Sequence, residues 1–198
     1  MKTAAKARLN CRFTEQSRLE MPHEMNEHLP EISDPSIQRF IDRFLETTGR
    51  RDIKRDAFVI DTFGDTPELT ESLLALVLAG TKTATCMSLW EWEHDNDTPL
   101  RPGMLSIICD STGLPRCVIE TQQVEQVAYQ DVTADFARAE GEHEPLDLPD
   151  DQVLEHWRAG HWAYYTRALG KIGRTPSMDM PVLCEHFTVL HAEDATSR

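Results

Sequence analysis

The centre of the chain contains two strand-like segments connected by a turn too short to hold a helix. Residues 104–110 (MLSIICD) and 116–129 (RCVIETQQVEQVAY) are rich in β-branched and apolar residues, and 111–115 (STGLP) supplies the turn between them. Strands joined by so short a connection pair antiparallel, because a parallel pair needs a crossover of about a dozen residues or more. The chain is therefore expected to fold around an antiparallel hairpin with one buried face.

Strand-like and helix-like segments alternate on both sides of this hairpin. Apolar, β-branched runs predict further strands at 57–63, 83–90 and 181–191, and helical periods predict helices at 36–47, 66–80, 133–140 and 150–170. Hairpin rather than βαβ spacing in the middle of such a pattern predicts the α+β class. We expect a small, curved antiparallel β-barrel with flanking helices.

These elements fit a single domain over residues 34–191. The chain has 198 residues, and one hydrophobic core commonly serves about 100–200 residues. Residues 1–33 carry scattered charges without a sustained apolar period and are predicted to form a weakly ordered arm, while 192–198 form a C-terminal tail. The helix at 36–47 is predicted to bury Phe40 and Phe44 against the barrel, closing an edge or covering its end.

The charge balance argues against polyanionic partners. Asp and Glu outnumber Lys and Arg by 34 to 20, for a net charge of −14, and residues 56–198 hold only 9 of the basic residues. Such a field disfavours DNA and anionic membrane surfaces. A run of about 18 apolar residues is absent, and charges interrupt the N-terminus before a signal sequence could form, so a cytoplasmic location is expected. The sequence does not indicate an oligomeric state.

Common cofactor and metal motifs are absent from the sequence. It contains no GxxxxGK[ST], GxGxxG, GxSxG, HExxH or CxxC, so no cofactor and no metal are predicted. The odd number of cysteines and their wide spacing indicate reduced, buried thiols. These are Cys11, Cys86, Cys109, Cys117 and Cys184.

Lys82 stands out because it is the only lysine between Lys54 and Lys171. It follows Gly80, the predicted end of a helix, and lies where a strand begins. At such a junction its side chain and that of Thr85 can enter one pocket, although strict strand alternation would separate them.

This grouping could support nucleophilic catalysis. A threonine hydroxyl attacks a carbonyl only if a base accepts its proton, and a partly buried lysine with a lowered pKa can be that base. Glu140 or Glu142 would orient the lysine or carry the proton. The alternative is that Lys82 forms a surface salt bridge and Thr85 only fills a strand.

Motifs spread over about residues 36–191 resemble the ASCH-domain family. The residues that carry the resemblance are Phe63-Gly64-Asp65, Pro67-Glu68-Leu69, 76–85 (LVLAGTKTAT), Gly103, 119–121 (IET), Val127, Phe136, 139–142 (AEGE), His161-Trp162 and Pro181-Val182. The chain is most similar to a longer branch of the family that adds an N-terminal helix. The resemblance implies a fold like that of PUA domains, a small β-barrel with helices around it, and an association with RNA.

The resemblance also implies an activity. One characterised type in the family is an amidohydrolase that removes the acetyl group from N4-acetylcytidine with a lysine, a threonine and a glutamate, which fall on Lys82, Thr85 and Glu142. Single-stranded RNA cleavage also occurs in the family. Short members often have an arginine at the position of Met87, so a phosphate or carboxylate contact by that arginine is in doubt here.

Aromatic and polar residues near Lys82 are candidate substrate contacts. Trp90 and Trp92 could form a pocket wall and stack a base, and Glu140 and Thr83 could bind the ligand. His161 is more simply explained as a hydrogen-bonded histidine on the apolar face of its helix.

Three functions remain open at this point. The first is hydrolysis of a small modified nucleoside with an amide bond like that of an N4-acylcytidine, and the second is RNA binding or single-strand RNA cleavage. The third is a module that senses a nucleobase without turnover. The acidic charge favours a small nucleoside-like ligand over RNA.

Overall fold

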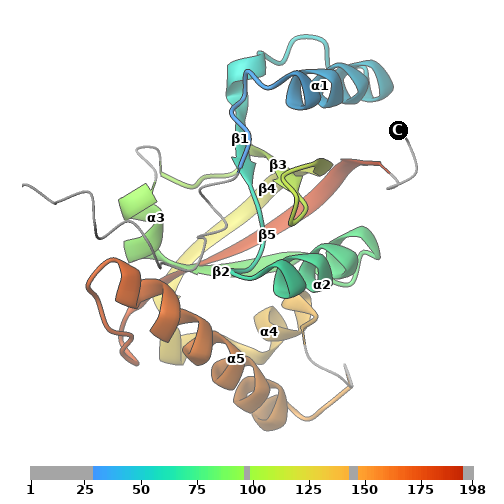
Figure 1. Cartoon of the computed structure of the whole chain (residues 1–198). Coiled ribbons are helices and arrows are strands. Elements are labelled where there is room, and N and C mark those ends of the chain that lie inside the picture. The colour runs from blue at the N-terminus through green and yellow to red at the C-terminus, as the bar shows by residue number, and fades with distance from the viewer. Residues whose placement is uncertain (1–28, 96–98, 143–146, 194–198) are drawn as a thin grey trace, which may run out of the picture.

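The computed structural model describes residues 29–95, 99–142 and 147–193, so most of the predicted arm, Cys11 and residues 194–198 lie outside the description. The described residues form one five-stranded sheet with helices around it (Figure 1). The strands are β1 (Phe58–Asp61), β2 (Ala84–Ser88), β3 (Leu105–Cys109), β4 (Pro115–Ala128) and β5 (Pro181–Ala192). The α+β class is therefore confirmed.

The sheet is mixed and open. Its strand order is β1-β3-β4-β5-β2, and the predicted hairpin is the antiparallel pair β3–β4. β1 runs parallel to β3, with Phe58 opposite Leu105. The chain between them is long enough for the crossover that a parallel pair needs. Over the described residues β1 and β2 are the two edges and do not pair with each other, so the prediction of an antiparallel barrel was wrong.

The four predicted helices are present. The described helices are α1 (Pro35–Thr48), α2 (Pro67–Leu78), α3 (Leu89–Asp95), α4 (Ala134–Glu140) and α5 (Asp150–Lys171), with short 3-10 turns at Arg55–Ala57 and Tyr129–Asp131. α3 was not predicted, because 83–90 had been assigned wholly to a strand. The hydroxyl of Ser88 accepts a hydrogen bond from the Trp90 amide at 3.2 Å, which ends β2 and starts α3.

α1 and α2 cover opposite faces of the β3–β4 hairpin. Ile107 packs in a cluster with Phe40 and Phe44 of α1, whereas the next residue, Ile108, packs in a cluster with α2. Phe40 and Phe44 are fully buried, as predicted. Leu29 and Ile32, at the end of the predicted arm, also pack on the α1 cluster.

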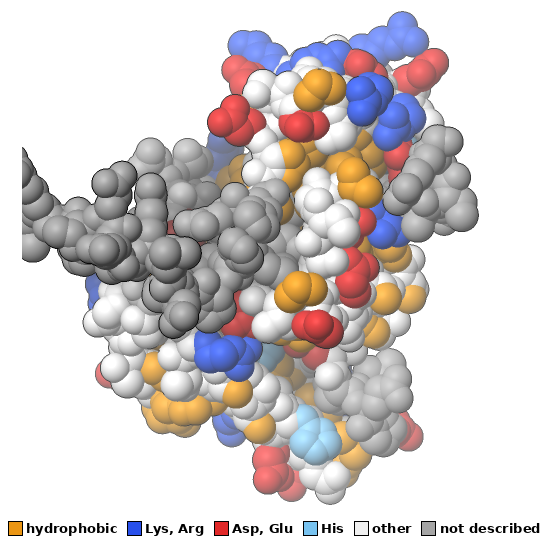
Figure 2. All heavy atoms as spheres, in the orientation of Figure 1, with side chains coloured by type: hydrophobic (Ala, Val, Ile, Leu, Met, Phe, Trp, Pro, Cys, Tyr) orange, Lys and Arg blue, Asp and Glu red, His pale blue; other side chains and the backbone are white. Residues whose placement is uncertain are grey.

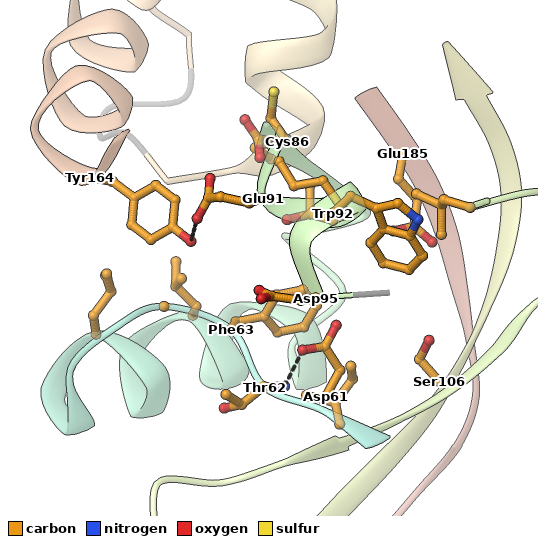
Figure 3. A pocket seen from close by; sticks show the side chains of 18 of the residues that line it. Asp61, Thr62, Phe63, Cys86, Glu91, Trp92, Asp95, Ser106, Tyr164 and Glu185 are labelled. Atoms are coloured by element: carbon orange, nitrogen blue, oxygen red, sulfur yellow. Dashed lines mark hydrogen bonds between the residues drawn. The ribbon is translucent and has the colours of Figure 1, made fainter. Parts of the chain in front are cut away.

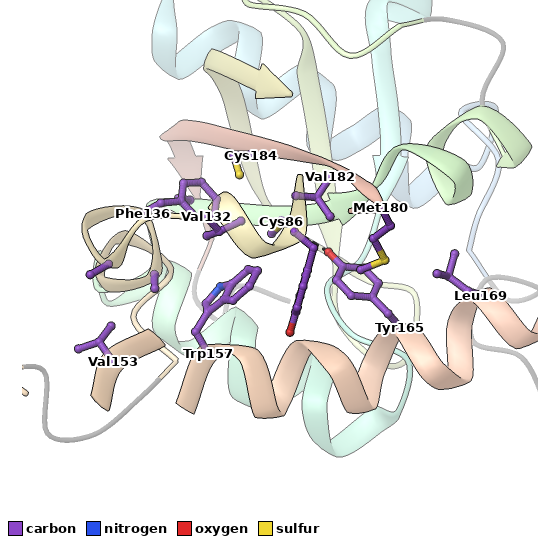
Figure 4. Packing of buried hydrophobic residues seen from close by; sticks show 14 residues of the cluster. Cys86, Val132, Phe136, Val153, Trp157, Tyr165, Leu169, Met180, Val182 and Cys184 are labelled. Atoms are coloured by element: carbon purple, nitrogen blue, oxygen red, sulfur yellow. Dashed lines mark hydrogen bonds between the residues drawn. The ribbon is translucent and has the colours of Figure 1, made fainter. Parts of the chain in front are cut away.

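A third apolar cluster joins α4 and α5 to β2 and β5 (Figure 4). Trp157 and Tyr165 of α5 supply its large side chains, together with Cys86 from β2. The four cysteines in the described part, which are Cys86, Cys109, Cys117 and Cys184, are buried free thiols, as predicted. No helix among the described residues is long and apolar enough to cross a membrane.

Candidate active site

The end of α2 places Lys82. The amides of Thr81 and Lys82 donate to the Leu76 carbonyl at 2.9 and 3.1 Å, and Gly80 adopts the left-handed conformation (φ 74°) that this helix ending requires. The Thr83 amide then donates to the Ala139 carbonyl at 2.8 Å. These bonds hold Lys82 beside the C-terminal end of α4, where the two candidate glutamates lie.

Lys82 is 1% exposed and is held between two carboxylates. Its ammonium donates to Glu142 Oε1, and to Glu140 Oε1 at 3.4 Å. Burial opposes the positive charge, but Glu140 and Glu142 together outweigh it and raise the pKa of Lys82. The raised pKa favours the ammonium form of Lys82, which fits an ion-pair role better than that of a base accepting the threonine proton.

Glu140 is the centre of the buried network. It is 1% exposed and accepts hydrogen bonds from Lys82 and from Trp157 Nε1, while His161 Nε2 lies 3.3 Å from its Oε2. Burial would raise the pKa of Glu140, but the positive charges of His161 and Lys82 lower it to about 2. For His161, burial is outweighed by Glu140, so its pKa is raised. Lys82, together with His161 when it is protonated, thus balances the buried carboxylate of Glu140 and the partly exposed carboxylate of Glu142.

Glu140, Glu142 and His161 of this network line a cavity of about 740 Å³, and Figure 3 shows part of the cavity's lining. The volume is within the usual range of about 300–1,000 Å³ for small-molecule sites. Thr85 lines the cavity together with Glu140, Glu142 and His161. Lys82 is not among the described lining residues and lies behind the two glutamates. Within the part of the chain that the structure describes, Thr85 makes no hydrogen bond to the network, so it shares the cavity with Glu142 without contacting Lys82.

Two of the four predicted substrate contacts line the cavity. Trp92 and Glu140 line the cavity, but Trp90 and Thr83 are not among its described lining residues. The Thr83 hydroxyl donates to a backbone carbonyl at 3.3 Å, and the Arg174 guanidinium lies 4.6 Å above the ring of Trp90.

The cavity is lined by more acidic than basic side chains. The acidic residues are Asp61, Glu91, Asp95, Glu140, Glu142 and Glu185, and the basic residues are His94, His161 and Arg167. Arg167 is already engaged by Asp65 through two hydrogen bonds of 2.8 and 2.9 Å. Met87, at the position of the missing arginine, also lines the cavity and adds no charge.

The comparisons identify the family. The ASCH-domain profile matches residues 59–191, which is most of the chain and includes the whole Lys82 network. The chain belongs to the ASCH-domain family. α1 precedes the matched region, and no curated protein sequence matches the chain.

Two crystal structures are similar to this ASCH domain. An ASCH domain from Lactobacillus crispatus JV V101 has a TM-score of 0.66 at 24% identity, over 79% of this chain and 95% of that one. A protein from Enterococcus faecalis V583 has a TM-score of 0.65 at 26% identity, over 78% of this chain and 87% of that one. The fold of the described domain is therefore the one these structures share.

Sequence reasoning missed three carboxyls that line the cavity of this ASCH domain, of which Glu185 is buried and Asp61 and Glu91 are half-buried. Burial raises the pKa of Asp61 to about 6 and those of Glu91 and Glu185 to about 7. Glu185 gave a detectable signal, because it is a charged residue inside an apolar strand (VLCEHF). Among the described residues, no group of three or more His, Cys, Asp or Glu side chains is arranged to hold a metal ion.

Proposed function

We propose that this ASCH protein is a hydrolase that cleaves the amide bond of a small modified nucleoside resembling N4-acylcytidine. The observation that carries the proposal is the buried Lys82 ammonium, fixed by two carboxylates beside a nucleoside-sized cavity that Thr85 also lines. Lys82, Thr85 and Glu142 are also the residues that carry the resemblance to the N4-acetylcytidine amidohydrolase type.

Glu142 is the general base in this proposal. Its side chain is 28% exposed, lines the cavity and accepts from Lys82, so it can reach both the network and a ligand. It takes the proton from the attacking group, which is the Thr85 hydroxyl or a water molecule. An ionised carboxylate can do this, whereas the protonated Lys82 cannot.

Lys82 and Glu140 support that base. The Lys82 ammonium orients Glu142 and offers positive charge close to the oxyanion that forms when the carbonyl is attacked. Glu140 contacts both Lys82 and His161, and its oxygens already accept hydrogen bonds from protein donors. We therefore assign Glu140 to positioning and Glu142 to proton transfer.

The charge around the cavity favours a nucleoside over RNA. Phosphates would approach several carboxylates, and the one arginine in the described lining is paired with Asp65. On the face shown in Figure 2, Lys and Arg side chains gather at the α1 end of the molecule. RNA binding or cleavage needs a continuous basic groove, so it is the weaker candidate. A nucleobase-sensing module would use the same cavity without turnover.

The test is incubation of the full chain with N4-acetylcytidine, longer N4-acyl cytidines and single-stranded RNA, with products separated by chromatography. We expect free cytidine from the acylated nucleosides and intact RNA. Glu142→Gln should lose about 10²-fold or more in kcat, the usual contribution of a general base, whereas the exposed Glu125→Gln should not. RNA fragments without deacylation would favour the ribonuclease, and tight nucleoside binding without products would favour the sensor.

A further inference from the structure

Glu185 faces the candidate nucleophile across two paired strands. It lies in the middle of β5, directly opposite Thr85 of β2 in their antiparallel register. Residues opposite each other in such a pair lie on the same face of the sheet, with Cβ atoms about 4.5–5.5 Å apart. Both residues line the cavity, and Figure 3 shows the Glu185 side chain at its wall.

The Glu185 carboxyl is buried and hydrogen-bonded to Thr121. The side chain is 4% exposed, and the Thr121 hydroxyl donates to its Oε1 at 2.6 Å. The cavity that Glu185 lines lies beside this carboxyl, so a ligand bound there can reach it.

Its surroundings keep a proton on this carboxyl near neutral pH. Burial is the main cause and raises the pKa of Glu185 to about 7, with Asp61 of β1 adding to the rise. The Thr121 hydrogen bond and the positive charge of Lys82 act in the opposite direction. Glu142, by contrast, sits at the partly exposed end of the network next to the Lys82 ammonium. The two carboxyls therefore occupy unlike environments in one cavity, an arrangement typical of acid–base pairs.

We propose that Glu185 is the general acid of the hydrolysis, which protonates the leaving nitrogen while Glu142 serves as the base. The inference rests on the proposed function. When the tetrahedral intermediate collapses, the carbon–nitrogen bond breaks and its electron pair goes to the exocyclic nitrogen. That nitrogen takes the proton from Glu185. The proton that Glu142 removed from the attacking group returns through solvent to Glu185. If water is the attacking group, the acid is formed at this point. If the Thr85 hydroxyl attacks, the acyl group remains as an ester on Thr85 until a water molecule deprotonated by Glu142 hydrolyses it, and Glu142 then returns that proton to the Thr85 oxygen. Either route consumes one water and forms one acid and one amine.

The experiment measures kcat and KM for N4-acetylcytidine from pH 5 to 9 in the full chain and in Glu185→Gln. In the wild type, kcat should fall as the pH rises above about 7, because Glu185 then loses its proton. Glu185→Gln should lower kcat by about 10²–10⁴-fold, leave KM nearly unchanged and abolish the alkaline fall. Glu125→Gln, exposed on the neighbouring strand β4, is the matched control for activity.

A second variant separates Glu185 from another carboxyl of similar pKa. Glu91 contacts Tyr164 on the other side of the cavity, and Glu91→Gln should retain the alkaline fall whatever its rate. Wild-type kcat that stays level from pH 6 to 9 overturns the inference even if Glu185→Gln fails to fold, and so does a folded Glu185→Gln with wild-type kcat. If the wild type hydrolyses no acylated nucleoside, the proposed function fails and the inference falls with it.

Discussion

Replacing Glu140 by glutamine removes the charge on which the buried network depends. The side chain keeps its shape, but Lys82 and His161 lose the carboxylate between them. The pKa of Glu140 is about 2 against an ordinary value of 4.5, and each pKa unit corresponds to about 1.4 kcal/mol. We therefore expect Glu140→Gln to lower the free energy of unfolding at pH 7 by about 3 kcal/mol.

The pH dependence of that loss has a definite sign. A lowered carboxyl pKa stabilises the fold above the unfolded value of about 4.5, and this contribution is lost as the pH falls toward 2. The raised pKa of His161 acts in reverse, because its contribution is present below 6.5 and is lost as the pH rises through the folded value. Glu140→Gln should flatten both slopes.

The assays are urea unfolding and thermal unfolding, both followed by tryptophan fluorescence at several pH values, with Glu125→Gln as the control. At pH 7 the midpoint of thermal unfolding should drop by roughly 6–12 °C, since about 1 kcal/mol shifts the midpoint of a domain of this size by 2–4 °C. A variant as stable as the control at pH 7, with the acid slope of the wild type preserved, would refute the reasoning that Glu140 is ionised and holds two buried cations.

Three further predictions concern the scaffold. Phe44→Ala should lower the free energy of unfolding in urea by about 3–5 kcal/mol, because the ring is fully buried; a loss below about 1 kcal/mol would show that α1 is a loose appendage. Gly141→Ala should cost about 1–3 kcal/mol and reduce kcat, because φ is +66° and a Cβ would lie 2.7 Å from the Thr81 carbonyl oxygen beside the glutamates; wild-type melting and turnover would contradict this. A chain that starts at Ser33 loses the contacts of Leu29 and Ile32, and its Tm should fall by less than about 10 °C; a larger drop would show that the predicted arm is a packed element.

Local sequence patterns were sufficient for α1, α2, α4 and α5, but not α3, and for part of the site. The α1 boundaries follow from Asp34, which accepts from the Ser36 amide at 2.7 Å, and from Gly49 with φ 70°. Lys82 and Glu142 are joined by an ion pair. The isolation of Lys82 in the sequence indicated the lysine, and the family motif indicated both residues. These features depend on neighbouring residues or on a motif, so they can be read along the chain.

The same local patterns could not predict how distant strands pair or which distant side chains meet. Nothing in 57–63 indicates that β1 would run parallel to β3, because the choice depends on how the intervening α2, β2 and α3 are arranged. The raised pKa of Lys82 depends on two charges about 60 positions away meeting it in a buried site. Glu185 becomes a site residue only through its register with Thr85.

The most direct test of the central claim is hydrolysis of N4-acetylcytidine in water enriched in ¹⁸O, followed by mass spectrometry of the acetate. We expect the wild type to release acetate carrying one ¹⁸O atom in an amount equal to cytidine, and Glu142→Gln to release almost none. Hydrolysis with Glu142 as the base is contradicted if the folded wild type releases no acetate, or if Glu142→Gln releases acetate at the wild-type rate.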